Sequence, residues 1–424
     1  FDGIPDLLVA PNSYENEGNL ELQRSSWLYR NTGTASQPNF EFEQDNFLQG
    51  QMIDLGENAY PAFADIDGDG LPDLLVGNGR SDRNGRFVAT LSLYRNTGTL
   101  AEPAFTFVTD DYLALSNQQM LSLKPAFFDI NQDGVLDLVL TYTAQRASEH
   151  ATAGTTHIDY FINNAKAGEP FALNTTQLLH LHTLANGDTP YLFRADDQRV
   201  EMLVGKAVGT LDYYRSSGNG FVLEKQGIGG IKFDFFSRNL APVVVDIDGN
   251  AKPDLLTVDD SGALRIYPDF MDKLDGDFAE ITEVLENELT GEAQTSRFGR
   301  GLGLAVAELG GPNKLYLAIG SQGGGLYLLE QTGGNSGNPN DNADKLGLKV
   351  YPNPVAGAQE PVQVQASESV SLVLYDMIGR KVYDAADSYN RRHTLNLGRL
   401  KAGVYLLRAT ARDGRHETRR LVIH

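Results

Sequence analysis

Residues 64–77 read Ala64-Asp65-Ile66-Asp67-Gly68-Asp69-Gly70-Leu71-Pro72-Asp73-Leu74-Leu75-Val76-Gly77. Four aspartates occupy positions 1, 3, 5 and 9 of a loop that begins at Asp65, glycine occupies position 6, and an apolar run follows. Ca²⁺ takes about six to eight oxygen ligands, and this spacing lets one tight loop wrap several carboxylates around the ion. Position 12 is valine, not the glutamate of an EF-hand, so we expect a calcium loop between two strands. The predicted ligands are Asp65, Asp67, Asp69 and Asp73.

The same spacing recurs in a second loop that begins at Asp129 and in a third loop that begins at Asp246. The third copy has Asn250 at position 5 and Ala251 in place of glycine, so we expect it to bind more weakly. Residues 2–9 match residues 69–76, which makes Asp2 and Asp6 candidate ligands and suggests that the domain starts before Phe1. A single Asp-Gly turn is common in β proteins, but three or four copies at one spacing favour a metal function. The further predicted ligands are Asp129, Asn131, Asp133 and Asp137, then Asp246, Asp248, Asn250 and Asp254.

Charge and composition limit the class of protein. The 424 residues carry a formal net charge of −21 and contain no cysteine, which excludes disulfides and thiol chemistry. Residues 345–424 hold 13 Lys and Arg against 7 Asp and Glu, a net of +6, which leaves −27 for the remainder. Such an acidic body argues against nucleic acid as a partner and suits bound cations. No apolar run is long enough for a transmembrane helix.

A unit of similar length repeats through the acidic part. After each loop comes a strand-like segment that ends in Tyr-Arg-Asn-Thr-Gly, as at residues 29–33 and 94–98, or in a divergent copy of it. The residue before each post-loop strand recurs at steps of 67, 64, 64, 53 and 61 residues, at Asp6, Asp73, Asp137, Glu201, Asp254 and Leu315. A four-stranded unit repeated about every sixty residues predicts an all-β protein with a β-propeller of six or seven blades.

These loops and the Asp-Leu-Leu-Val-Gly strands resemble the FG-GAP/VCBS repeats of integrin-type propellers and bacterial secreted proteins. The resemblance covers residues 1–330. It implies that the side chains at positions 1, 3, 5 and 9 hold Ca²⁺ together with the main-chain carbonyl at position 7. Those carbonyls would belong to Leu71, Val135 and Lys252.

A second signature follows a Gly- and Asn-rich stretch, residues 331–345, which we expect to be a flexible linker. Residues 346–424 contain Tyr-Pro-Asn-Pro at 351–354, Asp-Met-Ile-Gly-Arg at 376–380, Gly-Val-Tyr at 403–405 and a basic end. Short strands with turn signals between them predict a small Ig-like β-sandwich. The segment closely resembles the C-terminal sorting domain of the type IX (Por) secretion system. This resemblance implies a partner in that secretion machinery and a secreted or surface-attached protein of a Gram-negative bacterium.

Catalytic motifs are not evident in the sequence. His180 and His182 could form a metal pair on one strand face, although solvent-facing histidines are the simpler interpretation. Carboxylates outside the loops that could serve an enzyme are Asp110, Asp111, Asp196, Asp197 and Asp234. The repeated aromatic residues fit either blade core or a sugar-stacking platform: Tyr29, Tyr94, Tyr160, Tyr214, Tyr267 and Tyr327.

The sequence therefore predicts an exported, calcium-stabilised propeller that binds an extracellular glycan or protein through loops on one face. The alternative is a polysaccharide-degrading enzyme, a lyase or glycosidase, on the same scaffold. A catalytic domain upstream of Phe1 is a further alternative. We predict no catalytic residues in this chain.

Overall fold

Strands make up nearly all the regular structure of the computed structural model, which confirms the predicted all-β class. The structure describes residues 3–10, 25–48, 50, 52–83, 86–100, 102–118, 120–144, 154–195, 199–218, 220–232, 234–286, 293–311, 314–331, 346–355, 361–376, 380–398, 400–413 and 415–423. Two compact units are present. The first contains Phe1–Ile247, Ala251–Thr282 and Ser296–Thr332, and the second contains Asp248–Asn250, Glu283–Thr295 and Gly333–His424. The predicted linker lies almost entirely outside the described residues.

Antiparallel sheets follow one another along the first unit, each built from strands that are consecutive in sequence. Their strands, in chain order, are β1 (Leu7–Val9), β2 (Trp27–Asn31) and β3 (Phe40–Gln44); β4 (Glu57–Ala64), β5 (Asp73–Arg83), β6 (Arg86–Val88), β7 (Leu91–Asn96) and β8 (Phe105–Thr109); β9 (Met120–Phe128), β10 (Asp137–Ala144), β11 (Thr156–Phe161) and β12 (Leu179–Leu184); β13 (Thr189–Phe193), β14 (Glu201–Gly205), β15 (Leu211–Ser217) and β16 (Gly220–Lys225); β17 (Ala241–Val245), β18 (Asp254–Val258) and β19 (Arg265–Tyr267); and β22 (Gly303–Glu308), β23 (Leu315–Gly320) and β24 (Leu326–Glu330). The short helices η1 (Tyr112–Asn117) and η2 (Phe270–Lys273) and the pair β20 (Leu285–Glu286) and β21 (Ala293–Gln294) complete the elements before the linker.

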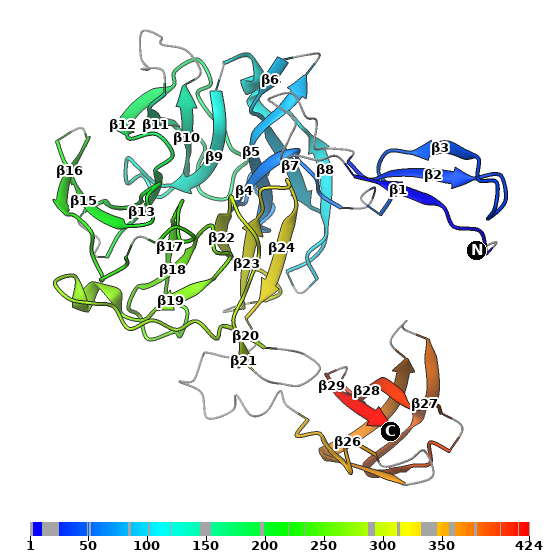
Figure 1. Ribbon diagram of the computed structural model, residues 1–424. Coiled ribbons are helices and arrows are strands. Elements are labelled where there is room, and N and C mark those ends of the chain that lie inside the picture. The colour runs from blue at the N-terminus through cyan, green and yellow to red at the C-terminus, as the bar shows by residue number, and fades with distance from the viewer. Residues whose placement is uncertain are drawn as a thin grey trace. The chain divides into compact units, whose positions relative to one another are not determined.

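Five of these sheets form a closed ring, which Figure 1 shows from β4 through to β24. The last sheet closes onto β4: Asn58 donates its backbone N–H to the carbonyl of Gln322 at 2.9 Å, and Ala59 forms a parallel bridge with Leu302. The predicted six or seven blades include the sheet β1–β3. The contacts that close the ring join the sheet β22–β24 directly to β4, so β1–β3 is not one of the sheets of the ring. Within the part of the chain that the structure describes, the ring itself therefore contains five sheets.

Glycines in three of the second strands allow neighbouring sheets to approach closely. A Cβ added to Gly77 would lie 1.8 Å from the carbonyl oxygen of Leu123 in the next sheet. The same contact recurs between Gly205 and the carbonyl of Leu240, at 2.0 Å. Gly320 repeats it against Ala59 at 1.9 Å, so ring closure uses the same geometry as the junctions at Gly77 and Gly205. The glycine of the Asp-Leu-Leu-Val-Gly motif is thus a packing requirement.

Apolar clusters fill the spaces between adjacent sheets. Leu75, Leu91 and Leu93 of the β4–β8 sheet pack against Leu138 and Leu140 of the β9–β12 sheet. A second cluster joins the β9–β12 sheet to β13–β16, and a third joins β13–β16 to β17–β19. Burial of this kind provides about 25 cal/mol per Å² of apolar surface, so the ring is stabilised at its sheet junctions.

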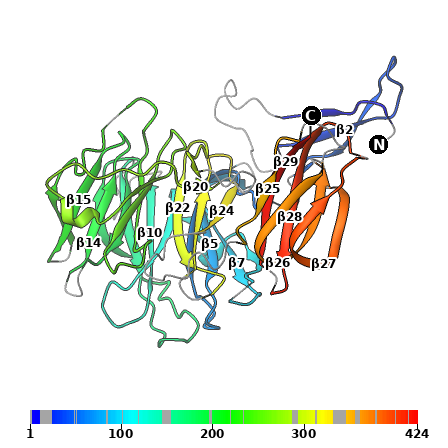
Figure 2. The same ribbon diagram turned by 90° about the horizontal axis from the view of Figure 1, so that it is seen from below.

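The C-terminal unit forms a five-stranded sheet in the order β25–β26–β28–β29, with β27 paired to β26. The strands, side by side in Figure 2, are β25 (Lys349–Tyr351), β26 (Val362–Asp376), β27 (Lys381–Leu395), β28 (Gly403–Ala411) and β29 (His416–Ile423). The register of β26 on β27 shifts between Gln365 and Val370, and the sheet surrounds a core that includes Val364, Leu372 and Leu407. The predicted second β domain is therefore present, with one continuous sheet where a sandwich would have two separate ones.

Candidate functional site

The three complete acidic loops occupy equivalent places in their sheets. Each joins the first strand to the second: β4 to β5, β9 to β10, and β17 to β18. Successive strands of a sheet run in opposite directions, so loops of this kind all lie on one face of the ring. Loops that join the second strand to the third, or one sheet to the next, lie on the opposite face.

Asp65 organises the first loop from position 1. Its Oδ1 accepts hydrogen bonds from the backbone N–H groups of Gly68 at 2.8 Å and Asp69 at 3.0 Å. Its Oδ2 accepts a hydrogen bond from Gly70 N–H at 2.8 Å. Gly68 and Gly70 have φ of 76° and 87°, which a side chain would disfavour. The aspartate and the glycines therefore shape the loop.

Asp73, at position 9, connects the loop to the body of the sheet. It is buried, and its Oδ2 accepts a hydrogen bond from Ile66 N–H at 3.1 Å while Oδ1 accepts one from Asn96 N–H at 2.8 Å. Burial raises the pKa of the Asp73 carboxyl and outweighs the opposing effect of these hydrogen bonds. A cation beside the carboxylate would favour its charged form.

Carboxylates at positions 1, 3 and 9 of the first loop converge. One oxygen from each of Asp65, Asp67 and Asp73 lies within 4.8 Å of the others. Asp67 Oδ2 forms an ion pair with Arg95 at 2.7 Å, but its Oδ1 is buried without a hydrogen-bond partner among the residues that the structure describes. A buried carboxylate oxygen without a partner carries a desolvation cost that a hard cation would remove. These residues therefore fit Ca²⁺.

Asp69, at position 5, lies apart from this group. It is exposed, and its Oδ1 accepts a hydrogen bond from Leu71 N–H at 2.8 Å.

The second loop repeats the backbone network of the first. Asp129 accepts hydrogen bonds from the N–H groups of Gln132, Asp133 and Gly134, and buried Asp137 accepts them from Ile130 and Asn163. At position 3 the amide of Asn131 donates to Asp133 Oδ2 at 2.9 Å, so this loop has one carboxylate fewer than the first. Val135 donates its N–H to Asp133 Oδ1 at 3.0 Å.

The third loop has the same frame with a strained bend. Asp254 accepts hydrogen bonds from Ile247 N–H at 3.0 Å and Asp269 N–H at 2.8 Å. Oxygens of Asp246, Asp248 and Asp254 lie within 4.8 Å of one another. Ala251 has φ of 65°, a left-handed conformation that favours glycine, and the other two loops have glycine at this position. Asn250 donates to Asp248. The Lys252 amine binds the side chain of Asp272.

The fragmentary first copy keeps only part of this arrangement. Asp6 Oδ1 accepts a hydrogen bond from Asn31 N–H at 2.9 Å, as Asp73 does from Asn96. Asp2 lies outside the described residues.

The sequence interpretation missed a repeated asparagine. Asn96 is buried; its Nδ2 donates to the Pro72 carbonyl at 3.3 Å, and its Oδ1 accepts from Gly98 N–H at 3.2 Å and Ala104 N–H at 3.1 Å. Asn31 and Asn163 form the same set of bonds. The sequence signal was the asparagine of the Tyr-Arg-Asn-Thr-Gly segments. This residue forms hydrogen bonds both to the acidic loop and to the segment that leads into the following strand.

Among the other candidates, His180 Nδ1 lies 2.7 Å from Asp159 Oδ1, whereas the His182 ring packs against Tyr214 and Phe221. Four of the repeated tyrosines pack against the apolar clusters, namely Tyr94, Tyr160, Tyr214 and Tyr267, and Tyr327 is largely exposed.

The extra carboxylates have separate local partners. Asp110 pairs with Arg83, Asp111 accepts hydrogen bonds from Ser116, and Asp234 accepts one from Phe236 N–H. Asp196 and Asp197 lie outside the described residues.

Comparison with known proteins agrees with both sequence signatures. The model of the FG-GAP-like repeat matches residues 1–76 and 65–140, and that of the secretion system C-terminal sorting domain matches residues 349–424. No curated protein matches the chain.

Solved structures similar to this chain include a fructofuranosidase from Schwanniomyces occidentalis complexed with fructose, at 9% identity and a TM-score of 0.37, covering 87% of this chain and 89% of that one. A Trypanosoma rangeli sialidase in complex with sialic acid gives 11% identity and a TM-score of 0.30, covering 93% of this chain and 78% of that one.

Within the described residues, no helix has the length and apolar character needed to cross a membrane. The sorting domain directs the protein through type IX secretion to the cell surface or the extracellular space. The chain therefore contains FG-GAP-like repeats, a β-propeller and a C-terminal type IX secretion sorting domain.

Proposed function

We propose that this protein is a calcium-stabilised binding module that acts outside the cell on a glycan or protein ligand. Calcium would occupy the acidic loops on one face of the ring. The ligand would contact the loops of the opposite face.

One observation carries the calcium assignment: Asp67, one of three converging carboxylates, has a buried Oδ1 without a hydrogen-bond partner in the described part of the chain. The backbone N–H groups around the loop are directed to Asp65 and Asp73, which leaves that oxygen without a donor. A hard cation satisfies it, whereas a softer metal would prefer nitrogen or sulfur ligands.

The opposite face exposes aromatic surface. Phe235 and Phe236, on the connection from β16 to β17, are 72% and 60% exposed and contact each other edge to face at 5.4 Å. Residues just after them contact the turn between β14 and β15, as in the hydrogen bond from Asn239 N–H to the Ala207 carbonyl. Exposed aromatic rings beside polar loops suit sugar faces or apolar side chains.

The calcium assignment is tested by thermal unfolding of the full chain after metal removal, followed by addition of Ca²⁺ alone. At a concentration of about 100 times Kd, each site adds about 2.7 kcal/mol. Asp67→Asn should remove most of the increment from the first loop. An unchanged melting temperature on adding Ca²⁺ would overturn the assignment.

Binding is tested on panels of polysaccharides and of extracellular proteins, with release of new reducing or unsaturated ends measured on the same samples. A Phe235→Ala/Phe236→Ala double variant should lose retention, whereas Phe107→Ala, which removes an exposed ring on β8, should not. Cleavage of a polysaccharide would replace this proposal with the enzyme alternative, and equal retention by all variants would exclude this face.

A further inference from the structure

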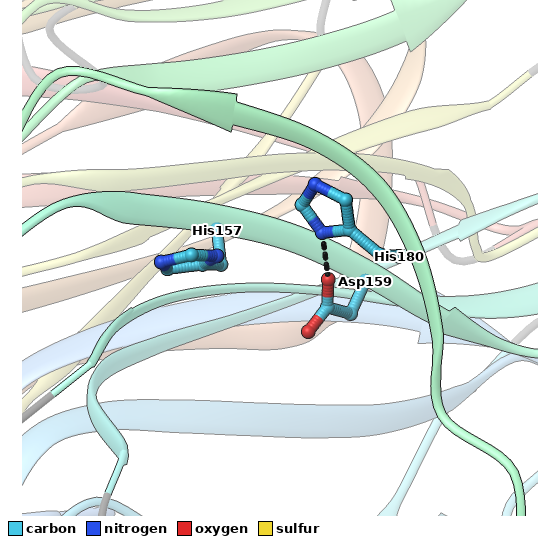
Figure 3. A group of neighbouring side chains, drawn as sticks. All are labelled: His157, Asp159 and His180. Atoms are coloured by element: carbon cyan, nitrogen blue, oxygen red, sulfur yellow. Dashed lines mark hydrogen bonds and ion pairs between the residues drawn. The ribbon is translucent and has the colours of Figure 1, made fainter. Parts of the chain in front are cut away.

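A second cluster of metal-binding side chains lies away from the acidic loops. His157 and Asp159 are two residues apart on β11, so they share a face, and His180 lies opposite Asp159 on β12. Figure 3 shows the three side chains gathered together. They occupy the same face of β11 as Phe161, which packs against the β4–β8 sheet. His157 pairs with Tyr142 toward the β10–β11 connection, at the end of these strands remote from the loop of residues 129–137.

His157 has a buried ring nitrogen without a hydrogen-bond partner among the described residues. The residue is 2% exposed, and its Nε2 lies 2.8 Å from Thr155 Oγ1, while Nδ1 contacts no hydrogen-bonding atom in the described part of the chain. If Nε2 carries the proton and donates it to Thr155, then Nδ1 presents a lone pair to the interior. A buried acceptor without a donor carries a desolvation cost that a bound cation would relieve.

Asp159 and His180 are held in place by their own neighbours. Asp159 Oδ1 lies 2.7 Å from His180 Nδ1, and Asp159 Oδ2 accepts a hydrogen bond from the Tyr142 hydroxyl at 2.5 Å. The other nitrogen of His180, Nε2, lies 3.3 Å from Thr183 Oγ1. The His157 ring stacks on Tyr142, with centroids 5.6 Å apart and an interplanar angle of 25°.

We propose that His157, Asp159 and His180 bind a divalent d-block cation, with Zn²⁺ as the best match. One ligand atom from each residue lies within 4.8 Å of the others, so a modest contraction around an ion would bring all three to bonding distance. Two imidazoles and one carboxylate form a donor set that suits Zn²⁺ better than Ca²⁺, which prefers oxygen. The proposal is independent of the calcium loops.

Each ligand already has the outer partner that such a site requires. Metal-bound histidines donate their second N–H to a neighbouring acceptor, which Thr155 and Thr183 supply here, and Tyr142 donates to the carboxylate. The side chain of His180 is 46% exposed, which gives an ion access from solvent. Three protein ligands leave a fourth position for water or an external ligand.

The test uses the untagged full chain with its calcium sites saturated, titrated with Zn²⁺ by calorimetry and with Co²⁺ by visible absorption. We expect one additional ion per chain. His180→Gln should weaken Zn²⁺ binding by more than about 100-fold, because loss of an outer partner alone costs roughly 10- to 100-fold. His182→Gln is the matched control on the same strand, since its ring packs against Tyr214 and Phe221 outside the cluster.

Tyr142→Phe provides a milder variant, which removes the hydroxyl that binds Asp159 and should weaken Zn²⁺ binding by at least about tenfold. Circular dichroism and thermal unfolding of each variant without zinc show whether the sheet has remained folded. No stoichiometric Zn²⁺, or an equal loss in His180→Gln and His182→Gln, would overturn the proposal. Calcium binding retained in that case would leave the proposed function standing.

Discussion

Replacing Asn96 with alanine should destabilise the ring while leaving the acidic loop sequence intact. The substitution removes three hydrogen bonds, to the Pro72 carbonyl and from the N–H groups of Gly98 and Ala104. Each contributes about 1 kcal/mol net, so we expect a loss of about 2–3 kcal/mol in the free energy of unfolding, with the higher figure if Gly98 N–H stays unsatisfied. The backbone bond from residue 96 to Asp73 remains available to alanine.

The assay is urea unfolding of the full chain followed by circular dichroism, with and without Ca²⁺. Thr97→Ala is the matched control, because Thr97 is the exposed neighbour and bonds through its hydroxyl to Thr106 at 2.9 Å. We expect a cost below about 1 kcal/mol for the control. A loss in Asn96→Ala no larger than in Thr97→Ala would refute the view that this asparagine connects the loop to its sheet.

Three further predictions follow from the same geometry. Asp67→Asn should weaken Ca²⁺ binding in calorimetry far more than Asp69→Asn, because Asp67 belongs to the three converging carboxylates and, among the described residues, has a buried oxygen without a hydrogen-bond partner, whereas Asp69 lies outside that group; equal effects would require Asp69 to move inward on binding. Gly205→Ala should cost more than about 3 kcal/mol in urea unfolding, since its Cβ would meet a backbone carbonyl at 2.0 Å, whereas Gly220→Ala, with 3.6 Å to the nearest atom, should be tolerated. Burial lowers the pKa of Lys124 to about 8, so between about pH 8 and 10.5 the unfolded chain binds more protons than the folded chain. The free energy of unfolding should therefore rise with pH across that window. Lys124→Met should abolish this rise in unfolding measurements at about pH 7.5 and 10.

Local sequence chemistry predicted the parts of the fold that depend on neighbouring residues. The acidic loops are hairpin connections because Asp65 and the glycines bend the backbone within six residues. Ring closure was not predictable in the same way. It depends on Gly320 reaching the backbone of Ala59, a contact between segments far apart in sequence that no local pattern specifies.

Sequence spacing predicted the site residues that belong to a single loop, but not those that come together from different strands. Asp65, Asp67 and Asp73 converge because they belong to one loop. Asp69 has the expected spacing, but it turns outward to Leu71 N–H. The group around His180 was hidden because its partners lie on β11, and the register shift between Ile158 and Asp159 decides which residue faces His180.

Comparison of the sheets separates what the ring needs from what the proposed calcium would add. The β13–β14 and β22–β23 hairpins lack the acidic loop, yet Gly205 and Gly320 make the same close approach to the next sheet as Gly77 does. Sheet packing is therefore the shared requirement, and an ion would act on single hairpins. Asn96 and Asn163 belong to sheets that carry an acidic loop. Their backbone N–H groups donate to the aspartates at position 9 of those loops, Asp73 and Asp137. It follows that metal removal should loosen the loop face first, and that hydrogen exchange at Ile66 and Asn96 should rise before exchange in the strands that Gly205 packs against.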